Sequence, residues 1–126
     1  MDASRALLAT LAALALAGCA TPAAPQAAHP APGAIEQTGL LHASGQEQAA
    51  PLDCPGVGDL SYSVVGSAGS LAILVTDDGT GTVLDTGPLQ GDAHSTVRGL
   101  LGGQDRWTVT VSMQAFTGGY SVALAC

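Results

Sequence analysis

The sequence has very little positive charge. It contains no lysine, and its three arginines stand against ten acidic residues, which gives a formal net charge of −7. No run of cations is present that would neutralise a series of phosphates, so nucleic acid is an unfavourable partner. The same argument applies to direct electrostatic binding of the chain to anionic lipid headgroups.

Aromatic residues and catalytic motifs are also scarce. One Trp, one Phe and two Tyr are present, so any core must be built mainly from aliphatic side chains. No Gly-x-Ser-x-Gly, HExxH, CxxC or P-loop pattern occurs, which leaves hydrolase, zinc and nucleotide functions without support. His94 lies close to Asp92 and several serines, but these residue types occur in almost every domain. We therefore expect a protein that is not an enzyme and has no cofactor.

The first eighteen residues have the order of a signal peptide. Arg5 precedes an apolar run over residues 6–17, and small residues end the run. The run has 12 residues, whereas a membrane-spanning helix needs about 20. Residues 1–18 are therefore predicted to be a cleaved signal peptide, with a short anchor helix or a buried N-terminal helix as the alternative.

The end of this run, Leu16-Ala17-Gly18-Cys19, resembles the lipobox of bacterial lipoproteins. The resemblance implies cleavage between Gly18 and Cys19, and acylation of Cys19 with chains such as palmitate. Two or three acyl chains hold a small domain firmly on a membrane, whereas one chain binds only marginally. Ala20 follows in place of Asp, which implies the outer membrane in a Gram-negative cell and otherwise the outer face of the cell membrane. The alternative is an ordinary signal peptide with a coincidental cysteine.

Residues 19–50 are rich in Ala, Pro, Gln and Gly. The prolines interrupt helices, and few side chains are able to form a core, so this segment is predicted to be a disordered linker. At roughly 3 Å per residue it would reach about 100 Å from the membrane. A short helix or an edge strand within residues 35–50 is the alternative.

Residues 51–126 have the pattern of a β domain. Apolar and polar residues alternate from Trp107 to Gln114 and again from Tyr120 to Leu124, which is typical of strands with one buried face. Glycine-containing segments at residues 77–81, 102–105 and 117–119 fit hairpin turns or links. The predicted fold is all-β, a small antiparallel sandwich or barrel of five to seven short strands.

Cys54 and Cys126 bracket this domain. In an exported protein the two thiols are expected to be oxidised. Cys126 also falls on the inward face that Tyr120 and Leu124 define in the predicted last strand. We predict an intramolecular disulfide between the two cysteines, and the alternatives are two free thiols or an intermolecular bridge.

A second resemblance covers residues 71–125. The strand from Trp107 to Gln114, the Gly-Gly turn and the strand from Tyr120 to Leu124 are similar to the closing hairpin of bacterial pre-peptidase C-terminal domains. Residues 71–85 would match the central strands of that family. The resemblance implies an accessory β-sandwich, a kind of domain that in some secreted enzymes binds polymers.

Two sets of residues have competing interpretations. Asp77 and Asp78, together with Asp85 and Asp92, are either calcium ligands or ordinary turn residues, and the spacing does not match an EF-hand, which favours the turn. Trp107 is either a core aromatic or a platform for a sugar, and its place in the strand pattern favours the core.

These features predict a membrane-anchored bacterial lipoprotein whose β domain has a structural or binding role at the cell envelope. The expected partners are the membrane, through the lipid anchor, and an envelope protein or glycan. The alternatives are an inhibitor or accessory subunit of an envelope enzyme, and a small hydrolase.

Overall fold

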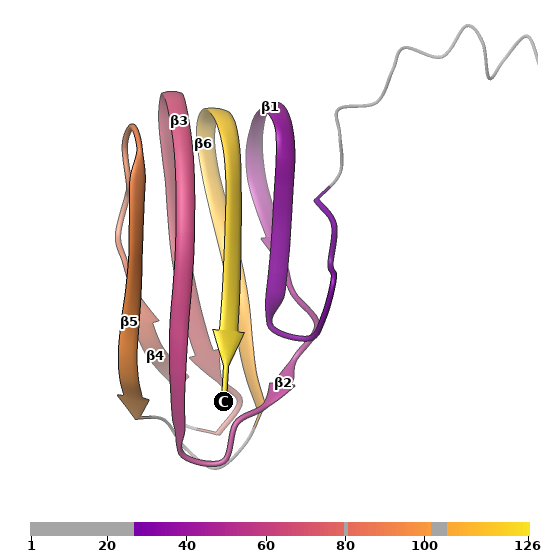
Figure 1. The fold of residues 1–126 in the computed structure, drawn as a ribbon, viewed down its shortest axis with the longest axis vertical. Helices are drawn as coiled ribbons and strands as arrows, with labels where there is room; N and C mark the ends of the chain where they lie inside the picture. Colours follow the sequence, from indigo (N-terminus) through magenta and orange to yellow (C-terminus); the bar gives the residue numbers. More distant parts are fainter. Residues whose placement is uncertain (1–26, 80, 102–105) are drawn as a thin grey trace, which may run out of the picture.

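The structure is a computed structural model that describes residues 27–79, 81–101 and 106–126. Within these ranges the chain forms six antiparallel β-strands (Figure 1). They are β1 (Ala34–Gln48), β2 (Leu52–Asp53), β3 (Val57–Asp77), β4 (Gly81–Asp85), β5 (Ala93–Leu101) and β6 (Arg106–Ala125). The all-β prediction is confirmed, and the sheet is not closed into a barrel. No helix in the described ranges is long and apolar enough to cross a membrane.

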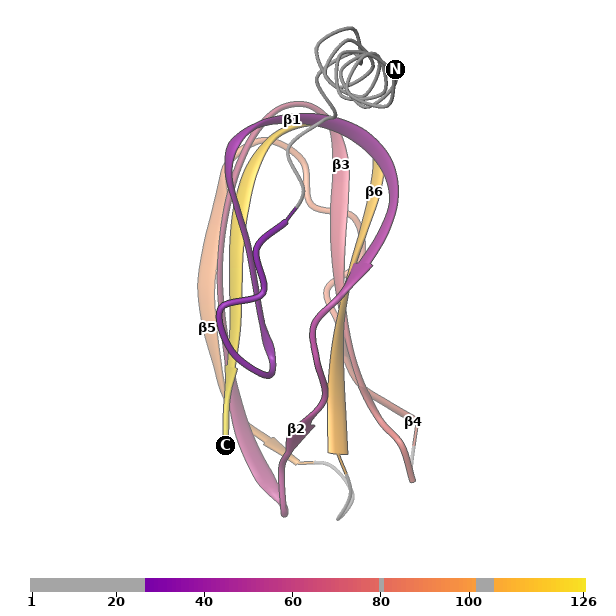
Figure 2. The same cartoon turned by 90° about the vertical axis from the view of Figure 1, so that its right-hand side faces the viewer.

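The molecule is one sheet folded into two layers. β6 pairs with β1 on one side and with β3 on the other, while β3 also pairs with β4 and β5. The long strands β1, β3 and β6 bend near their middles, so that their halves face each other (Figure 2). The front layer, as we call it, contains the first halves of β1 and β3, the second half of β6, and β5. The back layer contains the remaining halves with β2 and β4.

Glycines allow the strands to bend where the two layers join. The register between β3 and β6 shifts twice between Gly66 and Ser70. Gly69 and Gly118 lie there with φ angles of +70° and +149°. A Cβ on Gly118 would collide with the carbonyl oxygen of Val65, and one on Gly69 with that of Ala115. Only glycine fits these positions, so the fold of the sheet depends on them.

The predicted turn at residues 117–119 is wrong. β6 continues through this segment as one strand of 20 residues and passes from the back layer to the front layer. A glycine pair that interrupts an alternating pattern fits a bend as well as a turn, and the sequence does not separate the two. Phe116, beside the bend, is buried and packs edge-to-face against Tyr120, with ring centroids 6.5 Å apart. By contrast, the predicted hairpin at residues 77–81 is confirmed, because Asp77 at the end of β3 pairs with Gly81 at the start of β4.

The disordered linker predicted to run to residue 50 is also wrong, and the alternative of an edge strand within residues 35–50 is confirmed. Ala34–Gln48 forms β1, which pairs along its length with β6. The chain joins the sheet even earlier, because Ala28 and Glu36 exchange two backbone hydrogen bonds of 2.7 and 2.9 Å. His29 then lies 3.6 Å from Glu47 of the back-layer half of β1. The predicted signal peptide, Cys19 and residues 20–26 of the predicted linker lie outside the described residues.

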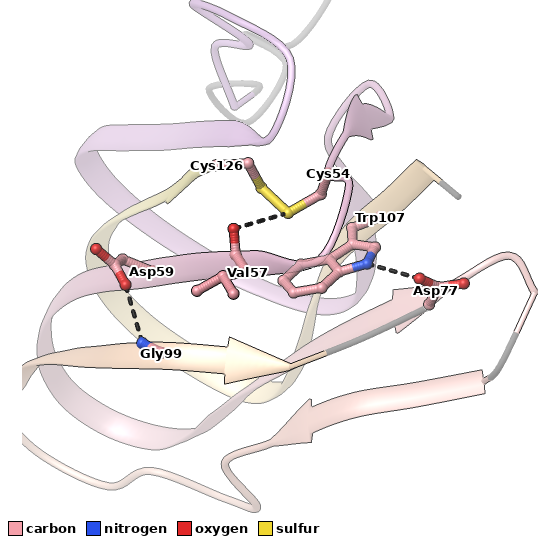
Figure 3. Close-up of a disulfide and its surroundings, with 7 residues drawn as sticks. All are labelled: Cys54, Val57, Asp59, Asp77, Gly99, Trp107 and Cys126. Atoms are coloured by element: carbon pink, nitrogen blue, oxygen red, sulfur yellow. Dashed lines mark hydrogen bonds between the residues drawn. A yellow bond between two sulfur atoms is a disulfide. The ribbon is translucent and has the colours of Figure 1, made fainter. Parts of the chain in front are cut away.

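The core lies between the layers and is mainly aliphatic, as expected. Trp107 is fully buried beside the Cys54–Cys126 disulfide (Figure 3). A Cβ on Gly58 would lie 2.7 Å from the Trp107 ring and 3.1 Å from both sulfur atoms. A fully buried Val, Leu or Ile contributes about 1.5–3 kcal/mol. The buried side chains are Ile35, Leu41, Ala49, Cys54, Leu60, Val64, Leu71, Ile73, Val75, Trp107, Val109, Val111, Met113, Phe116, Tyr120, Val122 and Leu124.

Candidate functional site

An open groove of about 620 Å³ lies beside the bend of the sheet. Its lining comes from β1, β3, β6 and the segment before β5, and it consists mostly of small side chains and glycine backbone. We call it the outer groove. Its lining residues are Gln37, Thr38, Gly39, Leu40, Ser63, Val65, Gly66, Ser67, Asp92, Gly118, Gly119, Tyr120 and Ser121.

A bulge in β1 forms one wall of the outer groove. The register with β6 jumps from Gln37–Tyr120 to Leu41–Gly118, so that three residues of β1 lie opposite Gly119 alone. A Cβ on Gly119 would lie 2.8 Å from the carbonyl oxygen of Gln37 and 3.4 Å from that of Gly39. The carbonyl oxygens of Gln37 and Gly39 therefore lie close to Gly119, in space that the side chain of a larger residue would occupy.

The segment before β5 forms the opposite wall. The backbone N–H of Gly66 donates a 3.2 Å hydrogen bond to Oδ1 of Asp92. A Cβ on Gly66 would lie 3.0 Å from the carbonyl oxygen of Gly91. This close approach fixes an exposed carboxylate at the side of the outer groove.

Two aliphatic side chains and several hydroxyls complete the surface. Leu40 and Val65 are 75% and 62% exposed, although both are large and hydrophobic. Ser63 and Ser121 are exposed cross-strand neighbours of β3 and β6. The outer groove therefore offers apolar contact together with hydroxyl groups.

Two residues of the lining, Gln37 and Tyr120, each have a buried side-chain polar atom without a hydrogen-bond partner. They are cross-strand neighbours and each is only 4% exposed. Oε1 of Gln37 and the hydroxyl of Tyr120 are the buried side-chain polar atoms of the described residues that have no hydrogen-bond partner. Burial, and after it the charge of Glu47, raise the pKa of Tyr120 to about 12. The phenol is therefore neutral at physiological pH.

A shallower hollow of about 300 Å³ adjoins the outer groove and shares Ser63 and Ser121 with it. His94 lies in this hollow, opposite Ser63 in the register of β3 and β5. Asp92 is bonded to the backbone of Gly66. The described hydrogen bonds thus do not join His94, a serine and a carboxylate in the order that a Ser-His-Asp hydrolase requires.

The candidate calcium ligands do not share a site, since Asp85 and Asp92 accept hydrogen bonds from the backbone of different segments, Gly87 and Gly66. Asp77 is 3% exposed and accepts hydrogen bonds of 2.7 Å from the Trp107 indole N–H and from the Gly79 backbone N–H. Asp78 is exposed. In the described ranges no group of three His, Cys, Asp or Glu residues is placed to hold a metal ion.

Three of the residues named from the sequence have the roles that were favoured for them. Cys54 and Cys126 form the expected disulfide, with their Cα atoms 5.3 Å apart, and Trp107 is a core residue. Sequence reasoning missed the outer groove completely. Its one local signal is the glycine content of residues 39, 66, 118 and 119, which fits turns equally well.

Comparisons with known proteins give distant structural similarity but no family. No protein-family model and no curated protein matches the sequence. A solved structure of TmCBM61 in complex with beta-1,4-galactotriose is similar at 17% identity and a TM-score of 0.44. The alignment covers 72% of this chain and 67% of that chain.

Proposed function

We propose that this chain is a bacterial lipoprotein, anchored through acylated Cys19, whose β-sandwich is a non-catalytic binding domain of the cell envelope. The lipobox resemblance of Leu16–Cys19 supports the anchor. The outer groove is the observation that carries the binding role. The groove's own chemistry, rather than any relative, indicates what kind of partner it takes.

The outer groove suits binding better than catalysis. Its walls, the bulge of β1 and the segment before β5, are held against the sheet by close backbone contacts at Gly119 and Gly66, so the groove is formed before any partner arrives. Among its described lining residues Asp92 is the one with a carboxylate, and that group already accepts a backbone hydrogen bond. A nucleophile activated by a neighbouring base, which covalent catalysis needs, is not assembled there.

Intact-mass measurement tests the anchor. The protein extracted from membranes is compared with a Cys19→Ser variant. We expect the wild-type chain to start at Cys19, to carry added acyl mass, and to lack the two thiol hydrogens of Cys54 and Cys126. An unacylated or uncleaved wild-type chain would remove the lipoprotein part of the proposal.

Site-specific photo-crosslinking in living cells tests the binding role. A photoreactive residue replaces Ser121 in the outer groove and, as a matched control, Thr82, which is exposed on β4 away from the groove. We expect position 121 to capture a defined envelope component that position 82 does not capture. No capture at 121, or the same capture at both positions, would remove the binding role and favour a structural one.

A further inference from the structure

We propose that the outer groove binds an extended peptide segment of a partner protein in which a lysine or arginine lies next to an aliphatic residue. This inference rests on the proposed binding role of the groove and names the ligand class. It is argued from the charge, the exposed apolar surface and the shape of the site.

The charge of the site favours a cationic ligand. The carbonyl oxygens of Gln37 and Gly39 converge over Gly119 on one wall, and the carboxylate of Asp92 lies on the other. No Lys, Arg or His occurs among the described lining residues. Elsewhere in the described ranges seven acidic residues stand against two arginines, Arg98 and Arg106. An ammonium or guanidinium group is therefore attracted, and an anionic ligand is repelled.

The exposed apolar side chains of the outer groove indicate that the ligand also carries an aliphatic group. The described residues include four large, exposed hydrophobic side chains, Leu40, Val57, Val65 and Leu101. Two of these four, Leu40 and Val65, line the outer groove. A clustered exposed apolar surface marks an interaction site, so the cation should be accompanied by an aliphatic group. A simple polyamine lacks that group.

The shape of the site fits an extended chain. The outer groove continues through Ser63 and Ser121 into the hollow that contains Ser61, His94 and Thr96. Together they run across the four strands of the front layer. Hydroxyls and carbonyl oxygens along this path match the N–H groups of a peptide backbone.

A neutral glycan fits the surface less well. Sugar rings pack their C–H faces on exposed aromatic rings, and all four aromatic residues of the chain are described. Trp107, Phe116 and Tyr120 are at most 4% exposed, and Tyr62 is only partly exposed. The surface therefore has no aromatic platform, which is why we commit to a peptide.

The experiment screens a random 12-residue peptide library against the purified full chain in a non-ionic detergent. We expect the enriched peptides to contain Lys or Arg beside Leu, Ile or Val. Asp92→Asn keeps an acceptor for Gly66 but removes the charge, and should weaken the best peptide about fivefold. Asp85→Asn is the matched control, since Asp85 is exposed outside the groove and also accepts a glycine N–H, that of Gly87 at 2.9 Å.

Two leucines give a second matched pair. Leu40 and Leu101 are 75% and 76% exposed, but only Leu40 lines the outer groove. Leu40→Ser should weaken the enriched peptides, whereas Leu101→Ser should leave their affinity unchanged.

Several outcomes would overturn the inference. They are enrichment of neutral or acidic peptides, an equal effect of Asp92→Asn and Asp85→Asn, or displacement of the peptides by a neutral oligosaccharide. If position 121 still captures an envelope component in that case, the binding role stands and only the peptide assignment fails. If position 121 captures nothing, the binding role fails as well.

Discussion

The indole N–H of Trp107 donates a 2.7 Å hydrogen bond to Oδ2 of Asp77, its cross-strand neighbour in the back layer (Figure 3). Both residues are buried. The other carboxylate oxygen of Asp77 accepts the N–H of Gly79 at 2.7 Å. The carboxylate of Asp77 thus accepts a hydrogen bond within the turn between β3 and β4. It also accepts the indole N–H of Trp107, the largest side chain of the core.

Replacing Asp77 tests this double role. Asp77→Ala leaves the buried indole N–H without its partner, and we expect the free energy of unfolding to fall by about 2–3 kcal/mol. Urea unfolding followed by the fluorescence of the single tryptophan measures the change. Asp78→Ala, at the exposed neighbour, should stay within about 0.5 kcal/mol of the wild type. Equal effects of the two substitutions would show that the Trp107–Asp77 bond contributes little.

The disulfide should be the largest single contribution to stability. Cys54 and Cys126 are separated by 72 positions, and a loop of that length corresponds to roughly 4.5 kcal/mol in the chain-entropy treatment. We expect the double variant Cys54→Ser, Cys126→Ser to lose about this much in urea unfolding. Reductant should destabilise the wild type by a similar amount and leave the double variant unchanged. A wild type that is insensitive to reductant would contradict the pairing.

The bend can be tested at Gly118. Gly118→Ala places a methyl group against the carbonyl oxygen of Val65. Gly81 also has a positive φ, but a Cβ there meets nothing within 4 Å, so Gly81→Ala reports backbone strain alone. We expect Gly118→Ala to destabilise by about 2–3 kcal/mol more than Gly81→Ala. Thermal unfolding of the two variants measures the difference, and equal losses would show that the strands tolerate a side chain at the bend.

Tyr120 should make stability depend on pH in the alkaline range. Its pKa is about 12 in the folded chain, raised from 10.0 by burial and by Glu47. Above pH 10.0 the unfolded chain loses this phenolic proton while the folded chain keeps it. The unfolded state then binds fewer protons, so the free energy of unfolding falls as the pH rises toward 12.

Tyr120→Phe should reduce this slope. Because the hydroxyl has no hydrogen-bond partner in the described residues, the substitution should cost less than about 0.5 kcal/mol at neutral pH. Urea unfolding at a series of pH values up to pH 11 measures both effects. Tyr62→Phe is the control, because it keeps the Tyr120 phenol and its contribution. An unchanged slope in Tyr120→Phe would mean that other groups cause the pH dependence.

The strands with clean alternation were predictable, whereas β1 was predicted only as an alternative to a disordered linker. The alternation from Trp107 to Gln114 identified a buried face correctly. In β1 the positions that face inward include Gln37 and Glu47, which are paired in register with Tyr120 and Val111. Polar residues at inward positions, preceded by several prolines, give this segment the sequence pattern of a linker. Its place in the sheet comes from its pairing with β6.

The outer groove could not be predicted because it exists only after distant segments meet. Gly119 matters because β1 bulges over it, and Asp92 matters because Gly66 lies beside it. Neither relationship has a local pattern, since each joins residues that are far apart in the sequence. The disulfide is also a long-range contact, but oxidation and the number of cysteines limit its possibilities.

If Cys19 carries a lipid anchor, the hydrogen bonds between Ala28 and Glu36 limit how far the domain can lie from the membrane. Only eight residues, 20–27, separate Cys19 from Ala28, and at about 3.6 Å per residue they span about 30 Å at most. This is roughly a third of the reach expected for a linker that ended at residue 50. If Cys19 carries the lipid, the sandwich stands close to the bilayer. Its partner must then come within a few nanometres of the membrane surface.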